Sequence, residues 1–219
     1  MRSGVSPPGV PRHLALIKAA LLLLALAPLA RLVGLTLSDQ LGANPVEFIT
    51  RSTGTWTLVL LLCTLAITPL RRLSGVGWLI RLRRMLGLTA FVYATLHALT
   101  WVWLDQWFDP ASMLRDVVQR PFVTAGFAAL LLLLPLALTS TDAMMRRLGR
   151  RWGQLHRLVY VALVASLLHY WWHKQGKNDW LEPALYALVG GLLLAARWLP
   201  GIRRSSAKSD STDSRSRMR

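Results

Sequence analysis

The stretch LALTSTDAMMRRLGRRWGQLHRLVYVALVASLLHYWW, residues 136–172, shows the pattern that decides the fold: an apolar run ends, a cluster of arginines follows, and a second apolar run begins. The same segregation recurs along a chain of 219 residues that is 53% hydrophobic and yet carries a formal charge of +16. A soluble basic protein spreads its charges over amphipathic faces, whereas separate apolar runs and basic clusters are typical of a polytopic membrane protein.

The apolar runs have the length of transmembrane helices, since a helix crosses the hydrocarbon core with about 20 mostly apolar residues. The pattern predicts an all-α membrane protein, a six-helix bundle whose transmembrane domain covers 14–200. Its spans are expected at 14–35, 54–70, 85–104, 121–140, 155–173 and 181–199. Residues 1–13 are expected to form a cytoplasmic segment, and 201–219, rich in Ser and Arg, a disordered basic cytoplasmic tail.

The start of the chain also resembles a secretory signal, but its apolar run is longer than a usual signal core and Lys18 and Arg31 frame it. We therefore expect an uncleaved first helix.

Charge predicts the orientation of these spans. With six spans, most Lys and Arg residues fall on the side that holds both termini and the loops at 71–84 and 140–154. The positive-inside rule places that side in the cytoplasm. The basic clusters then lie beside lipid headgroups, which explains the charge without a nucleic-acid partner. Tryptophans gather at the opposite helix ends as an expected interfacial belt: Trp101, Trp103, Trp107, Trp171, Trp172 and Trp180.

Composition excludes several function classes. Cys63 is the single cysteine, which excludes a disulfide within the chain, a multi-cysteine zinc site and an all-cysteine iron–sulfur cluster. No glycine-rich phosphate loop is present, and the short loops leave no room for a soluble nucleotide-binding domain.

Histidines inside the spans are the candidate functional residues, because an ionisable residue in the membrane is costly to bury. His97 lies in the third span and His169 in the fifth, and these two spans are expected to be parallel. At about 1.5 Å per residue, both histidines lie roughly 20 Å from the cytoplasmic edge. Two imidazoles at equal depth on two helices can ligate one haem iron from opposite faces. We therefore predict a haem b held by His97 and His169.

Other interpretations remain open. An intramembrane histidine is often a packing residue or proton carrier, which leaves a non-redox transporter or scaffold as an alternative. His156, near the cytoplasmic edge, is either an interfacial cation or the ligand of a second haem. It does not share an ideal helix face with His169, so a relay through both needs a kink, a bulge or a rotated lower site. His173, one turn after His169, is an alternative ligand or a solvated interfacial residue.

Four arginines at the expected inner edge are candidates for holding haem propionates or a quinol, although arginines there also serve as topology signals. They are Arg83, Arg84, Arg150 and Arg151.

Three stretches resemble the MsrQ (YedZ) family of haem-binding membrane subunits, within the ferric-reductase-like transmembrane superfamily. They are TRSTGTWTLVLLLCTLAITPLRR at 50–72, RRMLGLTAFVYATLHALTWVW at 83–103, and the stretch at 136–172, which is the most specific. The resemblance covers 45–200. It implies that His97 and His169 are haem ligands, and it also implicates His156.

The resemblance further implies a function in the bacterial inner membrane. The family takes electrons from the respiratory quinone pool and passes them to a periplasmic molybdopterin methionine-sulfoxide reductase, which repairs oxidised periplasmic proteins. The chain itself would catalyse at most quinol oxidation. FMN is also associated with the family, but no residue here is assigned to it. A cytochrome b subunit of another membrane oxidoreductase remains an alternative.

The chain departs from the wider superfamily at two points. Ferric reductases and NADPH oxidases carry a second histidine on the third span, where Arg83 stands here. Arginine is a poor haem-iron ligand, so a second haem at His156 needs an unusual partner or is absent. Those relatives also carry a flavin and nicotinamide domain after the last helix. Without one, we expect electrons to enter from quinol or from a separate cytosolic flavin reductase.

Overall fold

The computed structural model describes residues 13–175 and 179–197, and within them all regular structure is helical. The described residues do not include the tail predicted at 201–219. Of the segment predicted at 1–13, they include His13 alone.

Each predicted span contains a helix. The long helices are α1 (Leu14–Leu37), α2 (Pro45–Ser74), α3 (Ile80–Thr100), α5 (Pro121–Leu138), α8 (Leu158–Gln175) and α9 (Leu181–Ala195).

Within the described residues, four segments are long and apolar enough to cross a membrane: α1, α2, α5 and the continuous stretch Gly77–Asp105 around α3. α9 is apolar but shorter, and α8 carries polar side chains in its last two turns. The prediction of an all-helical, multi-pass membrane protein is therefore confirmed. The count of six spans stays a prediction.

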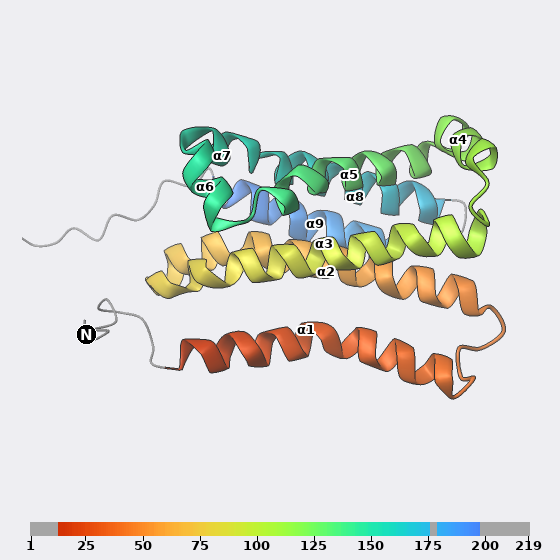
Figure 1. The fold of residues 1–219 in the computed structure, drawn as a ribbon, viewed down its shortest axis with the longest axis horizontal. Coiled ribbons are helices and arrows are strands. Elements are labelled where there is room, and N and C mark those ends of the chain that lie inside the picture. Colours follow the sequence, from red (N-terminus) through yellow and green to blue (C-terminus); the bar gives the residue numbers. More distant parts are fainter. Residues whose placement is uncertain (1–12, 176–178, 198–219) are drawn as a thin grey trace, which may run out of the picture.

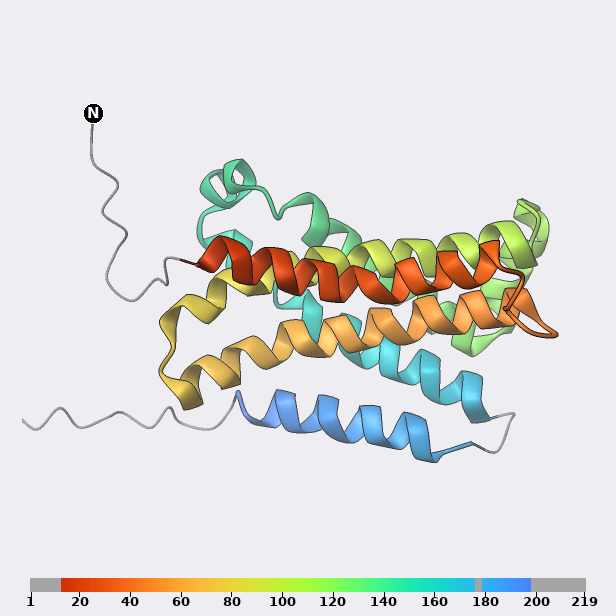
Figure 2. The same cartoon turned by 90° about the horizontal axis from the view of Figure 1, so that it is seen from below.

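The long helices lie side by side and alternate in direction, so that α3 and α8 run the same way (Figure 1). The closest packing occurs within two pairs, α2 with α3 and α5 with α8. α1 packs on α2 and α3, and α9 packs on α8 and α2, which puts both at the periphery (Figure 2). The two tight pairs form the centre of the bundle.

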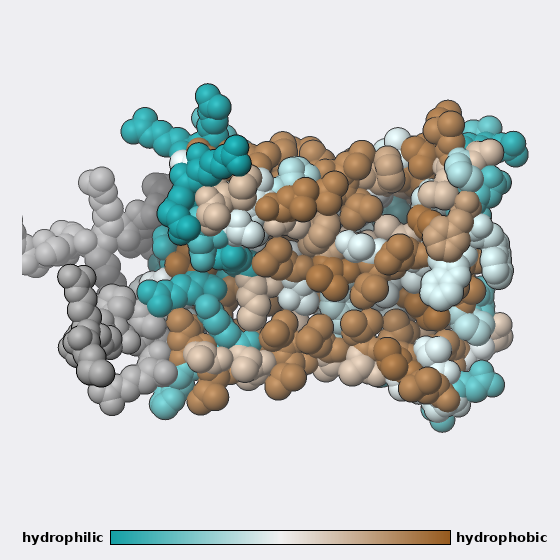
Figure 3. Space-filling model, in the orientation of Figure 1, coloured by the Kyte–Doolittle hydropathy of each residue, from teal (hydrophilic) through white to brown (hydrophobic). Residues whose placement is uncertain are grey.

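Short elements cover the two ends of the bundle (Figure 1). At one end lie the π-helical turn η2 (Trp101–Asp105) and α4 (Pro110–Gln119). At the other lie the 3-10 turn η1 (Gly77–Leu79), α6 (Asp142–Leu148) and α7 (Arg150–Leu155). A broad hydrophobic band separates the more polar ends, as expected for a surface that faces lipid (Figure 3).

The two ends differ in composition, and we name them accordingly. The tryptophan-rich end carries Trp101, Trp103, Trp107, Trp171, Trp172 and Trp180. The arginine-rich end carries Arg71, Arg72, Arg83, Arg84, Arg146, Arg147, Arg150, Arg151, Arg157 and Arg197.

The core is continuous along the bundle, and Leu65, Ala162 and Leu163 at its centre are fully inaccessible. Tyr93 of α3 is also buried, and its hydroxyl donates to the carbonyl oxygen of Ala25 at 2.8 Å and accepts from the Leu29 N–H at 3.2 Å. This polar link joins α1 to the central helices.

Candidate functional site

His97 and His169 meet inside the bundle near its tryptophan-rich end. His97 lies in the last turn of α3, and His169 lies in the second half of α8. Their ring centroids are 5.8 Å apart and the ring planes are inclined by 76°. The parallel helices α3 and α8 therefore bring together the two histidines that the sequence places at the same depth in the membrane.

Each of the two imidazoles is oriented by a backbone carbonyl of the neighbouring helix. His97 Nδ1 lies 3.0 Å from the Thr50 carbonyl oxygen, and His169 Nδ1 lies 2.6 Å from the Phe122 carbonyl oxygen. A carbonyl can only accept, so Nδ1 carries the proton in both rings and Nε2 keeps its lone pair. This is the arrangement that metal-binding histidines adopt, with the second nitrogen held by a carbonyl.

A glycine makes room for each imidazole. A Cβ atom on Gly54 of α2 would lie 2.9 Å from His97 Cε1, and one on Gly126 of α5 would lie 2.7 Å from His169 Nδ1. Distances under 3.0 Å are shorter than real Cβ atoms show. Any other residue at 54 or 126 would therefore displace the ring or the helix.

The two half-sites repeat along the chain. Corresponding residues of the two half-sites are 72 positions apart in the sequence: Thr50 and Phe122, Gly54 and Gly126, and His97 and His169. In both halves the histidine follows its carbonyl acceptor by 47 residues. The sequence patterns did not reveal these four supporting positions, and their shared spacing is recognised once the helices are packed.

The helix changes its geometry directly after His97. The Thr100 hydroxyl donates to the His97 carbonyl oxygen at 2.7 Å, and the chain continues into the π-helical turn η2. Such turns are frequent at functional sites. The indole Nε1 of Trp101, in this turn, is buried without a hydrogen-bond partner in the part of the chain that the structure describes.

Further aromatic rings surround His169. The Phe122 ring lies 6.1 Å from the His169 ring and 5.5 Å from that of His173. His173 stacks on His169 at 6.5 Å. A hollow of about 390 Å³ opens beside them, lined by Pro121, Phe122, Trp172 and Gln175.

His156 lies at a break between two helices. α7 ends at Leu155 and α8 begins at Leu158, so His156 and His169 do not belong to one continuous helix. His156 stacks on Trp152 at 3.9 Å, and its Nδ1 lies 3.1 Å from the Trp152 carbonyl oxygen. Its Nε2 is buried beside the Leu136 carbonyl oxygen and makes no well-aligned hydrogen bond among the described residues.

The four candidate arginines occupy different environments. Arg83 is half-buried, and its charge acts on His156. Arg84 is exposed and forms an ion pair with Asp142 at 2.5 Å. Arg150 and Arg151 are exposed on α7. The structure therefore brings only Arg83 of the four towards the inside of the bundle.

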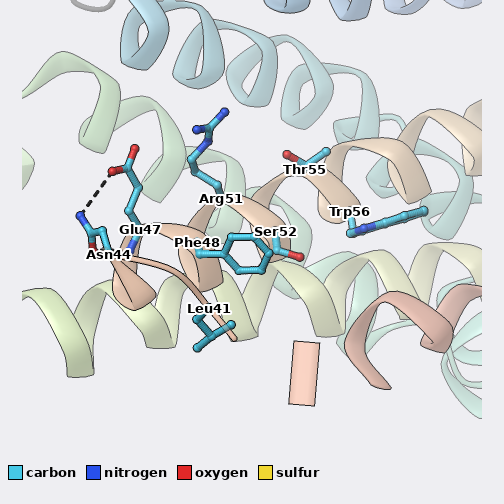
Figure 4. Close-up of a pocket in the computed structure, with 8 residues that line it drawn as sticks. All are labelled: Leu41, Asn44, Glu47, Phe48, Arg51, Ser52, Thr55 and Trp56. Atoms are coloured by element: carbon cyan, nitrogen blue, oxygen red, sulfur yellow. Dashed lines mark hydrogen bonds between the residues drawn. The ribbon is translucent and has the colours of Figure 1, made fainter. Parts of the chain in front are cut away.

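A separate groove of about 500 Å³ follows α2 at the tryptophan-rich end. Arg51 and Thr55 extend to one side of the helix, and Phe48 and Ser52 lie towards the other (Figure 4). At about 100° per residue, Phe48 and Ser52 lie on the opposite face of α2 from Thr50 and Gly54. The groove is therefore distinct from the histidine pair. Its lining consists of Leu41, Asn44, Glu47, Phe48, Arg51, Ser52, Thr55 and Trp56.

The fold and the paired histidines define a class, that of polytopic helical membrane proteins with a two-histidine site between tight helix pairs. Residues 53–167 match the family model of the ferric reductase like transmembrane component. This match contains His97, both glycines and the break at His156, and it ends two residues before His169.

Individual relatives identify the family more narrowly. The chain is 61% identical over 188 residues to the protein-methionine-sulfoxide reductase heme-binding subunit MsrQ of Ralstonia nicotianae, covering 85% of this chain and 87% of the relative. It is 56% identical over 196 residues to MsrQ of Bordetella pertussis, covering 90% and 95% of the two chains. The chain belongs to the MsrQ family. No solved structure matches it significantly.

Proposed function

We propose that this chain is the membrane electron-transfer subunit of a methionine-sulfoxide reductase system, and that it holds a haem b between His97 and His169. One observation carries the assignment: both Nδ1 atoms are bound to backbone carbonyls, and the rings, 5.8 Å apart, each keep an Nε2 lone pair. When bound, haem supplies a one-electron redox couple within the membrane. The names of the relatives, heme-binding subunits, agree with this chemistry.

The spacing of the two rings fits one iron. Metal–imidazole bonds are about 2 Å long, so rings on opposite sides of one metal ion have centroids about 6 Å apart. The observed 5.8 Å is close to this value. Within 13–175 and 179–197, no group of three or more His, Cys, Asp or Glu side chains could hold a metal ion. A pair of imidazoles suits haem, because the porphyrin supplies the remaining four ligands.

The rest of the chain supports this role. Apolar side chains of α2, α3, α5 and α8 pack into one continuous core, which holds the two imidazoles in place. The hollow beside Phe122 and Trp172 lies next to His169 at the tryptophan-rich end, where a periplasmic molybdopterin reductase subunit would receive electrons. A non-redox transporter or scaffold does not require two imidazoles that are each anchored through Nδ1 and lie 5.8 Å apart.

The topology is part of the proposal. We place six spans in the bacterial inner membrane, with the arginine-rich end and both termini in the cytoplasm and the tryptophan-rich end towards the periplasm. The domain limits remain 1–13, 14–200 and 201–219. Electrons would enter from respiratory quinol, or from a cytosolic flavin reductase with FMN as an associated group, and quinol oxidation is the one reaction assigned to this chain.

A second haem at His156 is favoured by one observation: its Nε2 atom is buried and makes no well-aligned hydrogen bond within the described residues. The nearby cationic residue is Arg83, which is suited to bind a propionate rather than iron. His156 would then be the one residue at the arginine-rich end that binds the iron of this second haem.

The experiment that tests the function uses membranes that contain the chain and its periplasmic reductase partner. Wild type is expected to support quinol-dependent reduction of methionine sulfoxide, whereas His97→Ala and His169→Ala abolish it. His13→Ala, an exposed histidine outside the bundle, is the matched control and keeps full activity. Full activity in both site variants would refute the assignment.

A further inference from the structure

Arg197, directly after α9, folds back into the arginine-rich end of the bundle. Its Nη2 donates to the Leu65 carbonyl oxygen at 3.1 Å, and its guanidinium lies over the Tyr160 ring, 4.6 Å from the centroid. It also donates to the Tyr160 hydroxyl. Arg72 donates to the Arg197 carbonyl oxygen at 3.3 Å. Arg197 thereby joins α2, α8 and α9.

Two polar atoms at this junction lack a partner. Arg197 Nε and Thr68 Oγ1 are buried and make no hydrogen bond within the described part of the chain. Thr68 lies one turn after Leu65 and one turn before Arg72, on the strip of α2 that contacts Arg197. Buried polar groups are nearly always hydrogen-bonded. An N–H donor and a hydroxyl that face the same region therefore indicate an acceptor that belongs to a ligand.

The charges at the junction show which kind of acceptor fits. Positive charge surrounds this junction: Arg72 of α2 donates to the Arg197 carbonyl oxygen, and the charges of Arg72 and Arg83 both act on the Arg197 guanidinium. The carboxylate described at this end, Asp142, pairs with Arg84 instead. Oxygens that carry negative charge would accept from Arg197 and Thr68 and offset the mutual repulsion of the arginines.

The geometry points to an anion-binding site formed by Arg197 and Thr68, which takes a carboxylate or a phosphate group. Two sources share this chemistry: a carboxylate of a porphyrin bound at His156, and a phosphate-bearing molecule such as a flavin nucleotide or a lipid. The site is separate from the pair formed by His97 and His169, at the opposite end of the bundle, and does not depend on it.

The test is a titration of the full-length protein in detergent with inorganic phosphate at constant ionic strength, read as the unfolding temperature. Phosphate is expected to stabilise wild type. Arg197→Gln is expected to weaken the apparent affinity about tenfold to a hundredfold, because a hydrogen bond to a charged group contributes about 1.5–3 kcal/mol. Thr68→Val, which keeps the shape, weakens it about fivefold. Arg71→Gln, an exposed arginine at the same end, leaves it unchanged.

Haem content distinguishes the two sources. If a porphyrin carboxylate occupies the site, phosphate has no effect on wild type, but Arg197→Gln and Thr68→Val contain less haem per chain than Arg71→Gln. If neither phosphate binding nor haem content differs between Arg197→Gln and wild type, the site does not exist. If Arg71→Gln lost phosphate affinity or haem to the same extent, the effect would come from surface charge in general, and the proposal would be wrong. The phosphate titration does not depend on haem at His97 and His169, so the two proposals fail separately.

Discussion

Gly54 and His97 approach so closely that a Cβ atom on residue 54 would lie 2.9 Å from Cε1 of the imidazole. The same relationship joins Gly126 to His169, 72 residues further along the chain. Each histidine is thus held between a carbonyl, which fixes its proton, and a glycine, which leaves it room. The site consists of two equivalent half-sites, each built by one tight helix pair.

Substitution of either glycine by alanine is expected to lower haem occupancy while the chain remains folded. The added methyl group forces the imidazole away from its carbonyl acceptor, and overpacking of this kind costs about 1–3 kcal/mol. The measurement is haem per chain by pyridine haemochromogen for Gly54→Ala and Gly126→Ala. Gly191→Ala on α9, where a Cβ would meet nothing within 4 Å, is the control and keeps its haem. Equal occupancy in all three variants would contradict the account.

Loss of the Tyr93 hydroxyl is expected to destabilise the bundle without changing the haem site. Tyr93→Phe leaves the Ala25 carbonyl oxygen without the donor that it has at 2.8 Å, and an unsatisfied buried group costs about 1–3 kcal/mol. The unfolding temperature should fall, while the absorption spectrum of the purified protein stays that of wild type. A changed spectrum would mean that α1 positions the histidines, which we do not expect.

Lys174 is expected to stabilise the tryptophan-rich end. Its side chain is only 4% exposed, and its Nζ lies 2.5 Å from Asp179 Oδ2 and 3.1 Å from Glu182 Oε2. Lys174→Met leaves two carboxylates facing each other. The free energy of unfolding is expected to fall by more than the about 1 kcal/mol that an exposed ion pair contributes. It should fall by less than the about 3–5 kcal/mol that is lost when a buried ion pair is broken. Thermal unfolding measures it, and Glu182→Gln added to Lys174→Met should recover part of the loss. No recovery would show that packing, not charge, is responsible.

The orientation of the bundle predicts which surface cysteines react from outside. In a Cys63→Ser background, Gln40→Cys and Arg115→Cys lie at the tryptophan-rich end, and Ser74→Cys and Arg147→Cys lie at the arginine-rich end. A membrane-impermeant maleimide added to spheroplasts should label the first two and reach the second two only after lysis. The reverse pattern would invert the topology, and a mixed pattern would change the number of spans.

Sequence alone could locate the two principal histidines because helical rise converts residue number into depth, and both residues stand at equal distance from basic boundaries. It could not supply their carbonyl partners or glycines, since Thr50 and Phe122 each lie 47 residues from the histidine that they bind. Such pairs become visible only when the helices are packed.

Two further features also required the structure. The break at His156 has no proline to mark it, so the apolar pattern at 155–173 reads as one helix. Arg197 reads as a topology signal in sequence, because its contacts with Leu65 and Tyr160 join residues far apart in the chain.

The measurement that tests the central claim most directly is the reduced-minus-oxidised absorption spectrum of the purified protein, with pyridine-haem quantitation. Wild type should give a b-type spectrum, His97→Ala and His169→Ala should lose it, and His13→Ala should keep it. His156→Ala would retain one haem per chain whether or not wild type carries a second. A colourless wild type produced with haem in supply, or full haem content in His97→Ala and His169→Ala, would contradict the account.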